Sequence, residues 1–86
     1  MIFLIEYNRT KGKLVKFQRF EDTAKLAAQN IRLELELELK KKGVEHEVVL
    51  LEAATEKALR KTHSRYFKNY EQIHSSLTSS RVSDRD

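Results

Sequence analysis

The most regular stretch of hydrophobic and polar positions runs from Asp22 to Lys42. Within it, residues 31–39 alternate strictly between apolar and charged side chains, which is typical of a strand with one buried face. The residue types favour a helix instead, because Leu, Glu, Ala, Lys and Arg are strong helix formers and Glu, Lys and Ala are depleted in strands. We therefore predict a helix over residues 22–42, with a strand over residues 31–39 as the alternative.

The two ends of this stretch carry helix signals. Asp22 can cap the start by accepting hydrogen bonds from backbone N–H groups. Three lysines, Lys40–Lys42, suit the negative end of the helix dipole, and Gly43 can take the left-handed conformation that ends a helix. These signals agree with the bounds predicted from the residue types.

The predicted helix has two apolar faces on nearly opposite sides, at about 100° per residue. The first face consists of Ala24, Ala27, Ala28, Ile31, Leu35 and Leu39. The second face consists of Leu26, Leu33 and Leu37. One face can lie on a sheet, and the other then needs a second helix or another subunit. A helix buried inside the chain and a dimer contact through Leu26, Leu33 and Leu37 are the two interpretations.

Before this helix the pattern predicts a hairpin. Residues 2–7 are nearly all apolar, which is typical of a central strand covered on both sides. Residues 8–13 carry a turn signal, with Gly12 available for a positive φ. Residues 14–19 then form the second strand, and the alternation predicts that Val15 and Phe17 face the core.

After the helix we expect a third strand and a second helix. Residues 45–52 form the strand, with four consecutive apolar residues at its centre, and Thr55 is the expected cap of the second helix. The apolar face of that helix would consist of Leu59, Thr62, Tyr66, Tyr70, Ile73 and Leu77. Residues 75–86 are small, polar and aperiodic, so we predict a disordered tail there.

The predicted fold class is α+β, with a single small domain over residues 1–74. Its elements follow the order ββαβα, and two helices pack on a three-stranded, mainly antiparallel sheet. A right-handed crossover and a central first strand give the strand order 2-1-3. The second helix could share the first helix's face of the sheet or cover the opposite face.

Charge adds a candidate partner. The chain has a formal net charge of +4, and residues 9–19 hold five bases and no acid. The second helix carries a basic ridge on the side opposite its apolar face. Together these segments supply six candidate nucleic-acid contacts, namely Arg9, Lys11, Lys13, Lys61, Arg65 and Lys68. A solvated basic face with no partner is the simpler interpretation.

The search for catalytic or metal chemistry finds little. The chain has no cysteine, and two glycines are too few for a phosphate-binding or dinucleotide-binding loop. On a strand, His46 would point away from Glu45 and Glu47, so we predict no metal site. Glu6 has the most unusual position of the acids, but a strand end in solvent explains it more simply. We therefore expect no enzyme, no catalytic residues and no cofactor.

The function favoured by these patterns is a small binding or regulatory module that acts through protein–protein interaction as a homodimer. Its expected partners are a second copy of the chain or another protein, and an RNA- or DNA-binding module is the alternative. No apolar run approaches the ~20 residues that span a bilayer, so we expect a cytoplasmic protein without a membrane partner.

Overall fold

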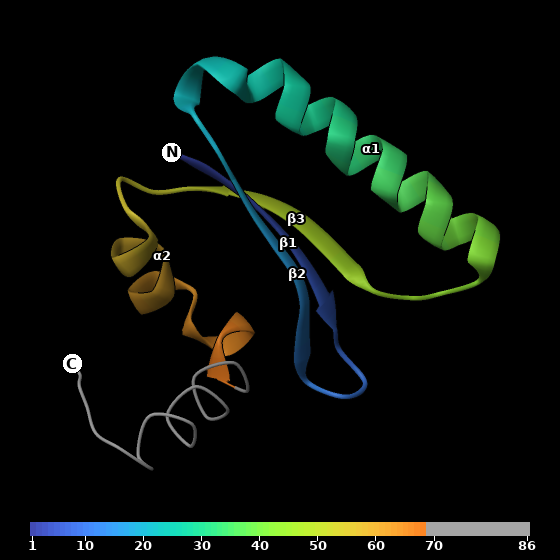
Figure 1. Cartoon of the computed structure of the whole chain (residues 1–86). Coiled ribbons are helices and arrows are strands. Elements are labelled where there is room, and N and C mark those ends of the chain that lie inside the picture. The colour runs from blue at the N-terminus through green and yellow to red at the C-terminus, as the bar shows by residue number, and fades with distance from the viewer. Residues whose placement is uncertain (69–86) are drawn as a thin grey trace, which may run out of the picture.

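The computed structural model describes residues 1–68, in which three strands and two helices follow the predicted order ββαβα (Figure 1). Two short 3-10 turns, η1 and η2, flank the helices. The elements are β1 (Ile2–Asn8), β2 (Lys13–Phe20), η1 (Asp22–Ala24), α1 (Lys25–Lys42), β3 (Glu47–Glu52), α2 (Glu56–Thr62) and η2 (Ser64–Tyr66).

The sheet has strand order β2-β1-β3, and β1 is antiparallel to both neighbours. The prediction of a central first strand is thereby confirmed. Phe3, Leu4 and Ile5 have no exposed surface, because successive side chains of a strand point to opposite faces and both faces are covered. The α+β class and the predicted strand order are both correct.

The two helices cover opposite faces of the sheet. Figure 1 shows α1 on one side of the strands, with α2 and η2 on the other. The sequence allowed the second helix to share the face of the first or to cover the opposite face, and the molecule has the helices on opposite faces. β1 consequently faces a helix on both sides, which explains why the run from Ile2 to Ile5 contains no polar residue.

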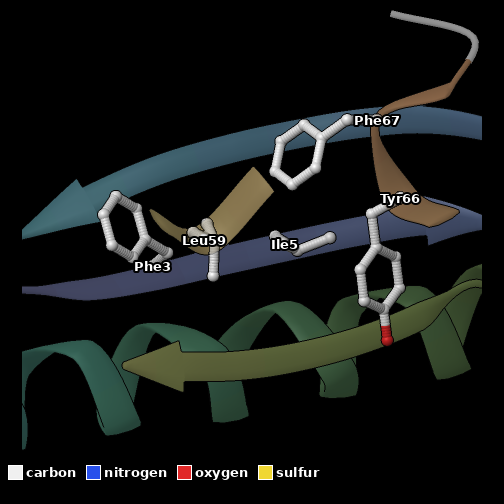
Figure 2. Close-up of a cluster of buried hydrophobic side chains, with 5 residues drawn as sticks. All are labelled: Phe3, Ile5, Leu59, Tyr66 and Phe67. Carbon is white, nitrogen blue, oxygen red and sulfur yellow. The ribbon is translucent and has the colours of Figure 1, made fainter. Parts of the chain in front are cut away.

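The larger core lies between the sheet and α2. Its fully or nearly fully buried members are Phe3, Ile5, Leu59, Tyr66 and Phe67 (Figure 2). Phe17 of β2 completes this core, because its ring stacks on Phe3 at 5.6 Å between centroids and meets the edge of Phe67 at 5.4 Å. The prediction that Phe17 faces the core is confirmed.

On the other face, α1 lies mainly over β3 and β1. Ala28 is fully buried there, and its small side chain lets the helix approach the sheet above Ile2 and Leu4. Ile31, Leu35 and Leu39 are half-buried on the same side of the helix, as predicted, whereas Ala27 is exposed.

The C-terminal end of α1 follows the prediction and its start does not. Gly43 has φ 69°, and its N–H group bonds to the carbonyl groups of the last turn. Asp22 was expected to cap the helix, but it lies in η1, and the residue at the N-cap of α1 is Ala24. Its carboxylate instead lies 2.6 Å from the amino group of Met1, and α1 begins three residues later, at Lys25.

The prediction that Val15 faces the core is wrong, because Val15 is 49% exposed. The pairing of β1 with β2 shifts at this point, so that Glu6 faces Lys16 whereas Tyr7 faces Leu14. Val15 is thus the extra residue of a β-bulge, and Leu14 packs against the core in its place.

The second helix is much shorter than predicted. Thr55 caps it as expected, by accepting a 3.1 Å hydrogen bond from the N–H of Ala58. The helix ends at Thr62, which is exposed, because His63 takes φ −125° and ψ 45°. The chain then turns through η2, which brings both Tyr66 and Phe67 onto the sheet.

The remaining residues predicted for the apolar face of this helix, Tyr70, Ile73 and Leu77, lie outside the described residues. The same is true of the predicted tail over residues 75–86. The third strand begins at Glu47 rather than at Glu45, because Glu45 and His46 belong to the connection from α1.

Phe67 should anchor η2 to the sheet. Replacing it in Phe67→Ala should lower the free energy of unfolding by about 3–5 kcal/mol, because a fully buried ring is removed. Val15→Ala on the exposed bulge is the control, with an expected change within about 0.5 kcal/mol. Urea titration followed by circular dichroism measures both. Equal losses in the two variants would contradict the role assigned to Phe67.

Candidate functional site

The outer face of α1 carries three of the four large hydrophobic side chains that are exposed among residues 1–68. Leu26 is 71% exposed, Leu33 52% and Leu37 55%. Their spacing of seven and four residues places them within about 40° of each other around the helix. The sheet lies against the opposite side of α1, so no element of residues 1–68 buries these leucines. Residues 1–68 therefore do not supply the internal cover that one of the two interpretations of this face requires.

A hollow of about 490 Å³ adjoins this outer face at its C-terminal end. It is lined by Glu34, Leu37, Glu38, Lys41 and Lys42. Lys42 and Glu38, four residues apart on the helix, form an ion pair at 3.2 Å. The hollow therefore has an apolar wall at Leu37 and a charged rim, and it has room for a partner's apolar side chain.

At one end of the sheet, a histidine and a carboxylate form a second feature. Nδ1 of His46 lies 2.6 Å from Oε2 of Glu6, and Glu6 is 6% exposed. The interpretation of Glu6 as a strand end in solvent is therefore wrong. α1 and the connection to β3 cover this face of β1, and a buried carboxylate needs a hydrogen-bond donor, which His46 supplies.

Next to this pair, Glu47 joins β3 to η2. Its Oε2 accepts hydrogen bonds from the Tyr66 hydroxyl at 2.6 Å and from Arg65 Nη2 at 2.9 Å. The bond from Tyr66, supported by Arg65, holds the pKa of Glu47 below its ordinary value. Burial, together with the bond to Glu47, raises the pKa of Tyr66, so the phenol keeps its proton.

A pocket of about 500 Å³ lies at the same end of the sheet. It is lined by Arg9, Thr10, Glu45, His46 and Glu47. Its charges are mixed, and the carboxylate of Glu47 is already satisfied by Tyr66 and Arg65. Among residues 1–68, no three His, Cys, Asp or Glu side chains come together as a metal site. The hydrogen bonds of Glu47 to Tyr66 and Arg65 therefore have a structural role, because they connect β3 to η2 at this end of the sheet.

The six predicted nucleic-acid contacts fall into two groups. Arg9, Lys11 and Lys13 are exposed at the tip of the hairpin. Lys61, Arg65 and Lys68 do not continue as a ridge on one helix, because α2 ends at Thr62. Lys61 and Lys68 are exposed, whereas the guanidinium group of Arg65 lies 4.1 Å from the Tyr66 ring centroid and bonds to Glu47.

Sequence reasoning missed the pair formed by Glu6 and His46. One signal was present, because Glu6 is the only charged residue within the otherwise apolar run of residues 2–7. A charged residue within the covered part of a strand needs a partner. The identity of that partner could not be read from the pattern, since His46 lies 40 residues away.

Comparisons of the chain with protein-family models, with curated proteins and with solved structures found no match. None of the helices within residues 1–68 is long and apolar enough to span a bilayer. Any functional proposal therefore depends on the residues themselves.

The hydroxyl of Tyr66 should control how the stability of the protein responds to acid. Because the pKa of Glu47 is lower in the folded chain, its ionised form stabilises the fold at neutral pH. That contribution is lost as the pH falls through the folded pKa. In Tyr66→Phe the pKa of Glu47 should rise towards its ordinary value, so this loss should shrink.

An NMR pH titration of the Glu47 carboxyl carbon measures the change in pKa directly. Tyr7→Phe is the matched control, because Tyr7 contacts Tyr66 edge-on at 5.2 Å but donates no hydrogen bond to Glu47 among the described residues. An unchanged titration of Glu47 in Tyr66→Phe would show that the hydroxyl does not set this pKa.

Proposed function

We propose that this protein is a small interaction module that self-associates through the outer face of α1. The observation that carries the proposal is the exposure of Leu26, Leu33 and Leu37 on one side of a helix whose other side is already packed on the sheet. Aligned exposed leucines are typical of a protein–protein contact rather than of a solvated helix. The expected partner is a second copy of the chain.

The spacing of the stripe supports helix-to-helix packing. Leu26, Asn30, Leu33 and Leu37 follow one another at intervals of four, three and four residues, as the core positions of a coiled coil do. Asn30 is exposed and is the one polar member. A single polar residue in such a seam lowers stability and helps to select one register.

The charges on α1 favour an antiparallel pair. In a parallel pair, Lys40–Lys42 would lie beside the same lysines of the partner, and Glu34 and Glu36 would lie beside the partner's acids. An antiparallel pair with Leu26 opposite the partner's Leu37 avoids both clashes. It brings the basic last turn of α1 level with Glu21 and Asp22 of the partner subunit, and it opposes the helix dipoles.

Negative charges introduced on the outer face should separate the subunits without unfolding them. Leu33→Glu combined with Leu37→Glu should give a folded monomer, because both side chains already contact water in the single chain. The matched control is Leu35→Glu combined with Leu39→Glu on the inner face, where burying two carboxylates should cost about 2 kcal/mol or more of stability. Sedimentation velocity and circular dichroism measure assembly and folding.

Two results would contradict this proposal. A monomeric unmodified protein at all concentrations would remove self-association altogether. A dimer that survives Leu33→Glu with Leu37→Glu would place the contact on another surface of the molecule.

Cysteine cross-linking tests the orientation separately, and the absence of native cysteine gives a clean background. In the antiparallel register, a mixture of Leu26→Cys and Leu37→Cys chains should form a disulfide between the two variants. Leu26→Cys alone should not cross-link, because its two copies lie about 16 Å apart along the helix axis. Efficient self-linking of Leu26→Cys would show a parallel dimer while leaving self-association intact.

A further inference from the structure

One edge of the sheet carries a row of positive charge. Five bases, Arg9, Lys11, Lys13, Lys16 and Arg19, follow one another along the hairpin tip and β2. All five are exposed, and no ion pair joins any of them to an acid within residues 1–68. β2 is an outer strand of the sheet, and no strand within residues 1–68 pairs with its other edge.

Two acids near this row have hydrogen-bond partners of their own, whereas a third, Glu21, is exposed two residues after Arg19. Glu6 lies opposite Lys16 in the pairing of β1 with β2, yet its carboxylate is buried and bonded to His46. Glu47 is close enough for the charge of Arg9 to lower its pKa, yet its hydrogen bonds go to Tyr66 and Arg65. Neither Glu6 nor Glu47 forms an ion pair with a base of this row, so the five cationic groups remain available to an external anion.

The shape of this charged row fits a linear polyanion. At about 3.4 Å per residue, β2 alone extends for roughly 27 Å, so its bases are spread along the edge strand rather than gathered round a pocket. Lys16 and Arg19 point to opposite faces of the sheet at this edge. A small anion would meet only one or two of them. A chain of regularly spaced phosphates can meet most of them at once.

We infer that the basic edge, defined as Arg9, Lys11, Lys13, Lys16 and Arg19, binds the phosphate backbone of a nucleic acid without reading its sequence. Phe17, the aromatic residue within this row, is stacked on Phe3 in the core and offers no platform for bases. The contacts are consequently electrostatic. This inference does not depend on self-association, because α1 and β2 present different surfaces.

Lys61, Arg65 and Lys68 are not part of this site. Arg65 is committed to Glu47 and stacks over the ring of Tyr66, and the end of α2 separates it from Lys61. Of the six contacts predicted from the sequence, the proposed site keeps the three in the hairpin, namely Arg9, Lys11 and Lys13. It also includes Lys16 and Arg19 of β2.

The test is fluorescence anisotropy with a labelled mixed-sequence oligonucleotide of about 12 nucleotides, as single strand and as duplex, at several salt concentrations. If all five bases contact phosphates, the logarithm of affinity should fall with the logarithm of salt with a slope of about −3.5 for the single strand. Affinity should then drop roughly a hundredfold between 50 and 200 mM salt. Comparison of the two probes identifies the preferred form of nucleic acid.

Two charge-matched variants locate the site. Lys11→Glu with Lys13→Glu should weaken binding by more than about tenfold and flatten the salt slope. Lys57→Glu with Lys61→Glu on α2 lowers the net charge equally, from +4 to zero, and should weaken binding by less than about threefold. All four lysines are exposed, so circular dichroism should show an unchanged fold.

Three outcomes would overturn the inference. The first is the absence of binding to either probe at low salt. The second is an equal loss in both variants, which would mean that net charge alone attracts the nucleic acid. The third is binding to vesicles rich in anionic phospholipid without binding to either oligonucleotide, which would make the basic edge a membrane-surface contact.

Discussion

The burial of β1 on both faces is the constraint on which the rest of the molecule depends. Phe3, Leu4 and Ile5 are removed from water completely, and each face requires its own cover. α1 supplies one cover and the segment from α2 to Phe67 supplies the other (Figure 2). Because α1 and α2 each cover one face of the sheet, no further element within residues 1–68 covers the outer side of α1. This is why Leu26, Leu33 and Leu37 are exposed.

The same constraint explains the polar contacts at the hairpin end. β1 is long enough that Glu6 lies within the covered region, so its carboxylate must find a donor inside the protein. His46 satisfies it on the side of α1. On the other side, Tyr66 and Arg65 converge on Glu47, while Arg65 also lies over the Tyr7 ring at 5.8 Å. These polar contacts hold the covering segments against the sheet at the end where the hydrophobic core stops.

Features set by local pattern were predictable from the sequence, and features set by distant contacts were not. The apolar run of β1 predicted its central position in the sheet. Gly43 predicted the end of α1, because its left-handed conformation is rare for other residues. The bulge at Val15 and the end of α2 at Thr62 have no periodic signal. They accompany contacts of Leu14, Tyr66 and Phe67 with the core, which involve residues far apart in the sequence.

The bulge in β2 has a further consequence for the solubility of the protein. An outer strand with unpaired backbone groups invites pairing with a strand of another molecule, and such pairing leads to aggregation. A bulge interrupts the regular row of donors and acceptors, and lysines along the strand repel a second copy of the same edge. Edge-to-edge joining of two sheets through β2 is thereby disfavoured, whatever else the strand contacts.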